Sequence, residues 1–156
     1  AAAAQSLIGY YLGAESVARA RRVARTACIW GFATGSALAL GMIALTKPAS
    51  LALLPESARA VFPLAWFFSA LAQPMNALSF VTDGIHMGTG DYRFLRNGMV
   101  VATLVSALLL FGVDRSPGGT LATIWLVTAV WIAMRTVWGM ARIWPGWGKA
   151  PLRPPN

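Results

Sequence analysis

The sequence predicts an all-α, polytopic integral membrane helix bundle with four full transmembrane helices and the end of a fifth. Two features of its composition support this class: hydrophobic residues make up 57% of the 156 residues, and charged residues only 12%. Soluble domains are less apolar and about twice as charged. A third observation is that long uncharged runs recur between basic segments. Their lengths fall in the range of about 17 to 25 residues that crosses a hydrocarbon core as a helix.

The first apolar stretch, residues 1–12, reaches only ~18 Å as a helix and cannot span a membrane alone. We interpret it as the end of a truncated helix that stops at Gly13, and not as a signal peptide, because no basic segment precedes it. A short basic loop is expected next, with Arg19, Arg21, Arg22 and Arg25. Two interpretations of this loop stay open: a nucleotide or anionic-lipid site, or a topology signal on the cytoplasmic side.

The first full span is expected at about residues 26–46. Small residues recur in it every four positions, at Ala27, Gly31, Gly35 and Ala39. Such a stripe lets another helix approach closely, so it predicts packing within the bundle. The following segment, residues 47–59, contains two prolines and is expected to be a loop with a short surface turn.

The second span, about residues 61–87, carries the polar groups of the chain's interior. Steps of four, three, seven and four place these groups on one helical face: Ser69, Gln73, Asn76, Asp83 and Met87. Pro74 lies beside this face and gives no amide to the Ala70 carbonyl, which predicts a bend. A bent, polar span predicts the lining of a transport path, with Gln73, Asn76 and Asp83 as pathway residues.

Two ionisable groups near the end of this span have two possible roles each. A charged Asp83 is costly in a bilayer, so it should face protein or water; it is either a proton-coupling group or the partner of a loop or a neighbouring arginine. His86 is either a proton relay or a histidine placed favourably at a helix C-terminus. With one histidine and no hydrolase motif, the chain is not expected to be an enzyme or to bind a metal.

The turn after this span, with Gly88, Gly90 and Asp91, should end one helix and cap the next. Further spans are expected at about residues 95–113 and 120–140, separated by a tight turn at 114–119. In the last span Trp131, Arg135 and Trp138 share a face. We expect the guanidinium to lie between the indoles and to reach the headgroups, with an anion site as the alternative. The tail, residues 142–156, is expected to be interfacial and then flexible.

Basic residues are distributed unevenly between the two expected sides of the membrane. Nine lie in the first loop, the 93–96 loop and the tail, against three at Lys47, Arg59 and Arg115. This bias predicts that the first loop and the C-terminus are cytoplasmic. We expect a multi-pass protein of the cell inner (plasma) membrane with this orientation. The net charge of +8 does not indicate nucleic-acid binding, because the basic residues form no soluble basic face.

The run QPMNALSFVTDGIHMGTGD, Gln73 to Asp91, resembles the tenth helix and following loop of MATE (multidrug and toxic compound extrusion) transporters, most closely their DNA-damage-inducible F-like branch. The pattern is a Gln-Pro pair, an apolar stretch, Asp-Gly, and then Gly-x-Gly-Asp. Residues 1–24 resemble the end of the eighth helix and the basic loop to the ninth. The resemblance implies that residues 1–156 are part of the C-terminal lobe of a twelve-helix protein. The N-terminal lobe and the preceding helices of the same protein are then the expected partners of this chain, and they are missing from it.

The resemblance also implies a function. Members of this family are secondary active antiporters that export cationic or amphipathic drugs and toxins by alternating access, in exchange for H⁺ or Na⁺ and with no other cofactor. In some sodium-coupled branches the position that matches Asn76 is a carboxylate, and the amide in this chain argues against sodium coupling through this helix. Two alternatives remain from the residues alone: a non-transporting membrane scaffold or assembly subunit, and a different secondary carrier.

Overall fold

The computed structural model describes residues 1–113, 116, 119–144, 146 and 148–153. Within this part all regular structure is helical, which confirms the expected fold class. The elements are α1 (Ala2–Gly13), α2 (Val17–Ala44), α3 (Thr46–Leu53), η1 (Glu56–Ala58), α4 (Phe62–Gly88), α5 (Tyr92–Leu109), η2 (Leu110–Gly112) and α6 (Gly119–Ile143). Among the described residues, four helices are long and apolar enough to cross a membrane: α2, α4, α5 with η2, and α6.

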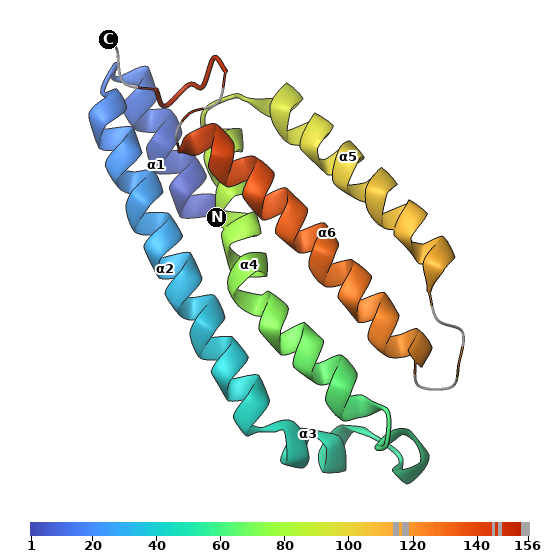
Figure 1. The fold of residues 1–156 in the computed structure, drawn as a ribbon. Coiled ribbons are helices and arrows are strands. Elements are labelled where there is room, and N and C mark those ends of the chain that lie inside the picture. Colours follow the sequence, from blue (N-terminus) through green and yellow to red (C-terminus); the bar gives the residue numbers. More distant parts are fainter. Residues whose placement is uncertain (114–115, 117–118, 145, 147, 154–156) are drawn as a thin grey trace.

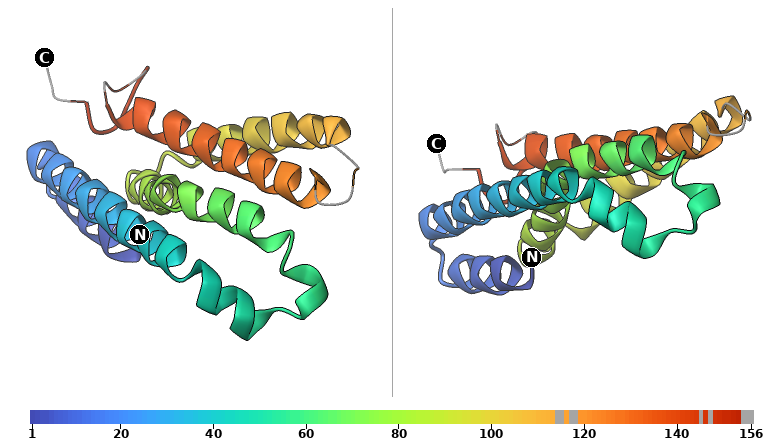
Figure 2. Two further views of the ribbon diagram at one scale, coloured as in Figure 1. Left: turned by 60° about the horizontal axis from the view of Figure 1, so that its bottom comes forward. Right: turned by 90° about the horizontal axis from the view of Figure 1, so that it is seen from below.

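The chain runs up and down, so the α1–α2 turn, the α4–α5 turn and the end of α6 lie at one end of the bundle (Figure 1). Nine basic residues belong to this end, here named the basic end: Arg19, Arg21, Arg22, Arg25, Arg93, Arg96, Arg142, Lys149 and Arg153. The central element is α4, which packs against α2 and α1 on one side and α6 on the other, while α5 packs mainly on α6 (Figure 2). Consequently α4 and α6 run in the same direction, toward the basic end.

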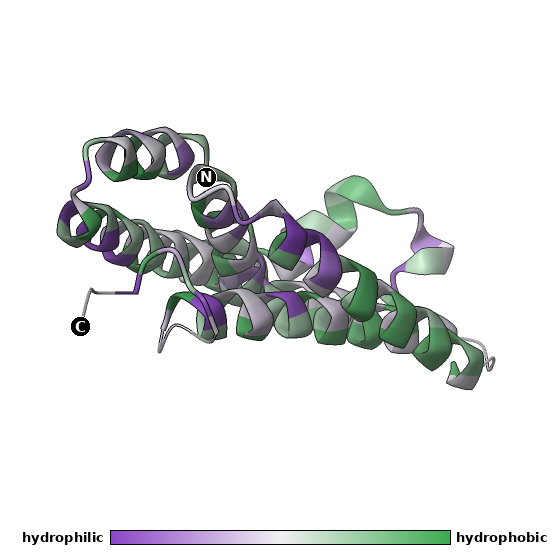
Figure 3. Ribbon diagram, turned by 90° about the horizontal axis from the view of Figure 1, so that it is seen from above, coloured by the Kyte–Doolittle hydropathy of each residue, from purple (hydrophilic) through white to green (hydrophobic). Residues whose placement is uncertain are grey.

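Large apolar side chains cover the outside of the bundle, as lipid-facing surfaces require and as soluble surfaces rarely do. Phe111 is 82% exposed, and Trp30, Leu40 and Leu108 are also mostly exposed. Figure 3 shows hydrophobic residues along the lengths of the helices and hydrophilic ones mainly near their ends. The exposed apolar surface therefore follows the helices identified as candidate spans.

The small-residue stripe of α2 packs against α4, which confirms the expected role of that stripe. A Cβ atom added at Gly31 would lie 2.8 Å from a methyl group of Val81, and one added at Gly35 would lie 2.7 Å from the Gln73 carbonyl oxygen. Ala39, farther along the stripe, is buried. At Gly35 the two backbones therefore approach to a distance that only glycine tolerates, whereas at Gly31 the close neighbour is the Val81 side chain.

Pro74 lies inside α4, and the helix changes direction part-way along its length (Figure 2). Proline has no amide hydrogen for the Ala70 carbonyl, which weakens the helix at this point. Two neighbouring helices contact the segment around it. From α2, Gly35 lies against Gln73 and Pro74. From α6, the Thr136 hydroxyl lies 2.8 Å from the Met75 carbonyl oxygen and can donate to it. Three helices therefore meet at the proline.

The basic segment before the first span is helical, so the expectation of a loop there is wrong. α2 already begins at Val17, after a tight turn in which Glu15 has a φ of 55°. Arginine and alanine are good helix formers, so the helix continues into the basic segment. Hydropathy locates the end of the apolar run, which is not the end of the helix. With 28 residues α2 is ~42 Å long, about 12 Å more than a ~30 Å hydrocarbon core. In addition, α3 and η1 occupy most of the segment expected to be a loop with one short turn.

The described part of the C-terminal segment packs onto the bundle, which the expectation of an interfacial and then flexible tail did not include. Leu152 is only 2% exposed and belongs to the core cluster with Ala20, Ala24 and Ile143. The Arg21 guanidinium donates a hydrogen bond to the Leu152 carbonyl. The described tail residues therefore pack back onto α2 and α6, whereas residues 154–156 lie outside the described part. Most of the expected turn at 114–119 lies outside it as well.

Candidate functional site

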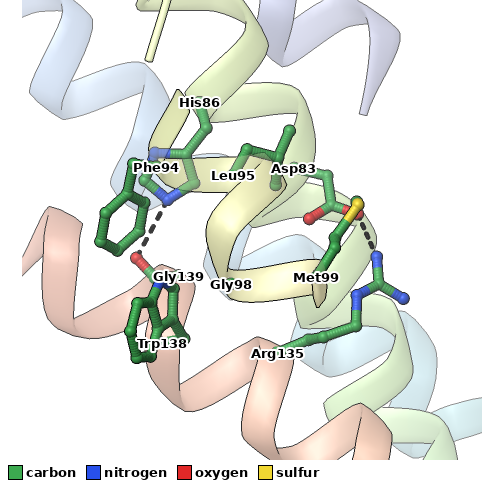
Figure 4. Close-up of a pocket in the computed structure, with 9 residues that line it drawn as sticks. All are labelled: Asp83, His86, Phe94, Leu95, Gly98, Met99, Arg135, Trp138 and Gly139. Atoms are coloured by element: carbon green, nitrogen blue, oxygen red, sulfur yellow. Dashed lines mark hydrogen bonds and ion pairs between the residues drawn. The ribbon is translucent and has the colours of Figure 1, made fainter. Parts of the chain in front are cut away.

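Asp83 of α4 and Arg135 of α6 form an ion pair near the basic end of the bundle (Figure 4). The Arg135 Nη2 donates to the Asp83 Oδ2 at 2.5 Å, and their side chains are 14% and 9% exposed for aspartate and arginine respectively. Asp83 lies five residues before the end of α4, or ~7.5 Å along the axis. Each charge alone would be costly at this depth, so the two side chains stabilise each other's charged form.

The position of Arg135 corrects the expectation that its guanidinium lies between two indoles and reaches the headgroups. The guanidinium turns inward to Asp83 and lies 4.4 Å from the Trp131 ring centre, a cation–π contact. Trp138 instead stacks on Phe94 of α5, with ring centres 5.5 Å apart. A carboxylate within reach in a low-dielectric interior attracts the guanidinium more strongly than the distant headgroups do. Of the two roles left open for Asp83, partner of a neighbouring arginine describes the observed geometry.

His86 lies one turn beyond Asp83 and is 2% exposed. Its Nε2 lies 3.2 Å from the Gly139 carbonyl oxygen of α6, and its ring packs 5.2 Å from that of Phe94. Asp83 and His86 line the same cavity, whose volume is about 10 Å³. That volume is about the smallest that holds one water molecule. This cavity therefore accommodates no drug-sized compound and has room for about one water molecule.

A second ion pair lies closer to the basic end. The Arg142 Nε donates to the Asp91 Oδ2 at 2.7 Å, and the Arg142 guanidinium lies 4.8 Å from the Phe94 ring centre. Asp91 stands at the N-cap position of α5 but makes no side-chain capping bond, so its expected capping role is wrong. The Asp91 carboxylate instead forms a charge-assisted hydrogen bond with Arg142.

The two ion pairs and the aromatic rings between them form one unit, here named the ion-pair cluster: Asp83, His86, Asp91, Phe94, Arg135, Trp138 and Arg142. Sequence reasoning missed Arg142 and Phe94. A signal was present, because the two acids are eight residues apart and the two arginines seven. These spacings match if α4 and α6 run in the same direction, which the structure shows.

Gln73 and Asn76 lie nearer the bend and do not line the Asp83 cavity. The Gln73 side chain donates to the Ser69 carbonyl oxygen of its own helix, at 3.1 Å. The Asn76 side chain is partly buried, and in the described part of the chain it makes no hydrogen bond. The structure thus joins Asp83 and His86 into one site and leaves the two amides separate. Their place on a transport path stays a prediction.

Comparison with known proteins agrees with the membrane fold. The MatE family model matches residues 1–111. The protein DETOXIFICATION 44, chloroplastic, of Arabidopsis thaliana is 32% identical over 99% of this chain, and DETOXIFICATION 45, chloroplastic, of the same plant is 34% identical over 78%. The chain spans only 30% and 21% of the lengths of these two relatives. No solved structure gives a significant match.

Proposed function

This chain belongs to the MatE family of membrane transporters, and from that premise we propose that its complete protein is a secondary active antiporter. The chain is part of a multi-pass membrane transporter and not of an enzyme. In the proposal it supplies the end of the eighth helix and helices nine to twelve. The complete protein exports cationic or amphipathic compounds by alternating access. The names of the relatives, which refer to detoxification, support the export of toxic compounds.

The observation that carries the proposal is the Asp83–Arg135 ion pair between α4 and α6. The pair holds together a helix that is bent at Pro74 and a helix that contacts this bend through Thr136. A proton taken up by Asp83 neutralises the carboxylate and removes the attraction for Arg135. The α4–α6 contact then weakens, so protonation favours a different arrangement of the bent helix. Coupling of this kind is what a proton-driven exchanger needs.

The geometry supports H⁺ over Na⁺ as the coupling ion at this position. Sodium binding needs several oxygen ligands, but among the described residues Asp83 is the only carboxylate that lines the cavity, and the Arg135 guanidinium repels a second cation. A proton needs one carboxylate oxygen. Asn76, an amide where some sodium-coupled branches have a carboxylate, agrees with this choice. His86 lines the same cavity and is proposed as the relay between Asp83 and the basic end.

Gln73 and Asn76 are proposed to contact the exported compound. They lie on the polar face beside the bend, and the Asn76 amide has donors and acceptors to offer. The basic end is proposed to face the cytoplasm of a cell inner membrane, which follows the positive-inside rule. The run from Gln73 to Asp91 supports placement in the DNA-damage-inducible F-like branch.

The test uses the complete protein reconstituted in liposomes. A fluorescent cation is loaded, and its transport is followed under an imposed proton gradient, an imposed sodium gradient, or neither. We expect transport with the proton gradient only, abolished by a protonophore. Transport that depends on sodium alone would reject the assignment of the coupling ion. Transport that occurs equally without any gradient would reject antiport and favour a different carrier. No transport under any condition would also reject antiport and favour a scaffold.

A further inference from the structure

A groove runs between α1 and α2 next to the turn that joins them, and its volume is about 570 Å³. Its lining includes Leu7 and Tyr11 of α1 and Arg19, Arg22, Val23 and Ala27 of α2. Because the two helices are antiparallel, Tyr11 and the arginines lie near the joining turn, whereas Ala27 and the first residues of α1 lie deeper along the bundle. The groove is therefore basic at one end and apolar at the other.

The arginines of the groove are available for a ligand. Arg19 and Arg22 are exposed, and neither forms an ion pair within the described part of the chain. The nearest acid in sequence, Glu15, makes no ion pair there either. The Arg19 guanidinium lies 6.0 Å from the Tyr11 ring centre, so an aromatic face borders the basic end of the groove. Unneutralised guanidinium groups of this kind bind phosphate oxygens.

The depth of the groove matches the layers of a bilayer. α2 exceeds the hydrocarbon core by about 12 Å, so its arginine-bearing first turns reach the headgroup layer while Ala27 lies at the level of the acyl chains. A neighbouring hollow, lined by Arg21, Arg22, Arg25 and Trp144, extends the basic surface sideways. Trp144 is of the residue type that gathers at membrane interfaces.

We propose that this groove binds one anionic phospholipid, with Arg19 and Arg22 contacting the phosphate group and the apolar part of the groove holding an acyl chain. If the arginines served only as a topology signal, positive charge at this end would suffice and no groove would be needed. A nucleotide or a free phosphate uses the arginines but leaves the apolar half empty. Only an anionic lipid matches both ends of the groove at the depth where they lie.

The test measures lipid retention by the complete protein with native mass spectrometry, using phosphatidylglycerol and phosphatidylcholine as probes. The test variant is Arg19→Gln/Arg22→Gln, and the matched control is Arg93→Gln/Arg96→Gln, which removes the same charge from exposed positions of α5 at the same end. Each arginine near an anionic headgroup contributes about fivefold, so the test variant should bind phosphatidylglycerol roughly tenfold to thirtyfold more weakly. The control should match the wild type.

Two further variants separate binding from folding. Arg19→Lys/Arg22→Lys keeps the charge and should retain most of the phosphatidylglycerol. Thr26→Trp places a bulky side chain at an exposed position of the groove lining, so it should reduce retention although both arginines remain.

Three results would overturn the proposal. The first is equal retention of both lipids by the wild type, which is expected if another segment of the complete protein fills the groove. The second is an equal loss of lipid in the test and control variants, and the third is displacement of the lipid by millimolar glycerol phosphate, which would indicate that the site binds a soluble anion.

Discussion

Gly35 of α2 lies directly against Pro74 of α4, where an added Cβ atom would come within 2.8 Å of the Pro74 Cα. The contact places a residue without a side chain opposite the one residue type that disrupts helical hydrogen bonding. A side chain at position 35 would have to displace α4 at its bend. The α2–α4 packing and the shape of α4 therefore depend on each other.

The first prediction concerns this contact. Gly35→Leu should lower the stability of the complete protein, because overpacking a tight interface costs about 1–3 kcal/mol and the atoms it meets are backbone. The midpoint of thermal unfolding in detergent, with size-exclusion chromatography as the readout, measures the effect. Gly41→Leu is the control, since a Cβ atom there meets no atom within 4 Å. Equal midpoints for the two variants would contradict the packing.

The second prediction concerns the bend. Pro74→Ala restores an amide for the Ala70 carbonyl, so α4 should straighten and its helix should gain stability. We expect efflux by the complete protein to fall while membrane abundance stays at or above the wild-type level. Full efflux by Pro74→Ala would show that the bend plays no part in transport.

The third prediction tests the polar face. Asn76→Ala should reduce efflux at normal membrane abundance, because the amide is proposed to contact the exported compound. Leu71→Ala, an exposed position on the same helix, serves as the control and should transport normally. If both variants behave alike, Asn76 does not line the path.

The fourth prediction concerns topology and follows from the charge bias. In a Cys28→Ala background, single cysteines at Ala14 and Asn97 should be protected from an impermeant thiol reagent added outside, whereas one at Ser57 should react. All three positions are exposed, so accessibility within the protein does not limit labelling. The reverse pattern would invert the proposed orientation.

Hydropathy predicted the all-helical class and the number of long apolar helices, because span length follows directly from bilayer thickness. It could not predict that α2 begins at Val17, since an arginine-rich stretch outside the core is equally compatible with a loop. The packing of Leu152 onto the core was also missed, because proline and glycine near it indicated an open tail. The local composition of a terminal segment does not predict which distant residues it packs against.

The site was predicted only in part, for a related reason. Asp83 and His86 were identified because ionisable groups near a membrane interior stand out in any sequence. Their partners were not, because a tryptophan-flanked Arg135 near a helix end is typical of an interfacial anchor. Its pairing with Asp83 depends on α4 and α6 running in the same direction, which is a property of the whole bundle.

The central claim is that Asp83, held by Arg135, is the proton-coupling group. Arg135→Gln alone should lower membrane abundance, because it leaves a buried carboxylate unpaired, at a typical cost of about 3–5 kcal/mol. Asp83→Asn/Arg135→Gln removes both charges and should restore abundance without restoring transport. This double variant separates loss of folding from loss of coupling.

The most direct measurement is drug efflux by the complete protein against external pH, for the wild type, Asp83→Asn and Asn76→Ala, normalised to protein in the membrane. An amide at position 83 cannot take up or release a proton, so Asp83→Asn should lose the pH response and be impaired more than Asn76→Ala. The account is contradicted if Asp83→Asn keeps the wild-type rate and pH profile.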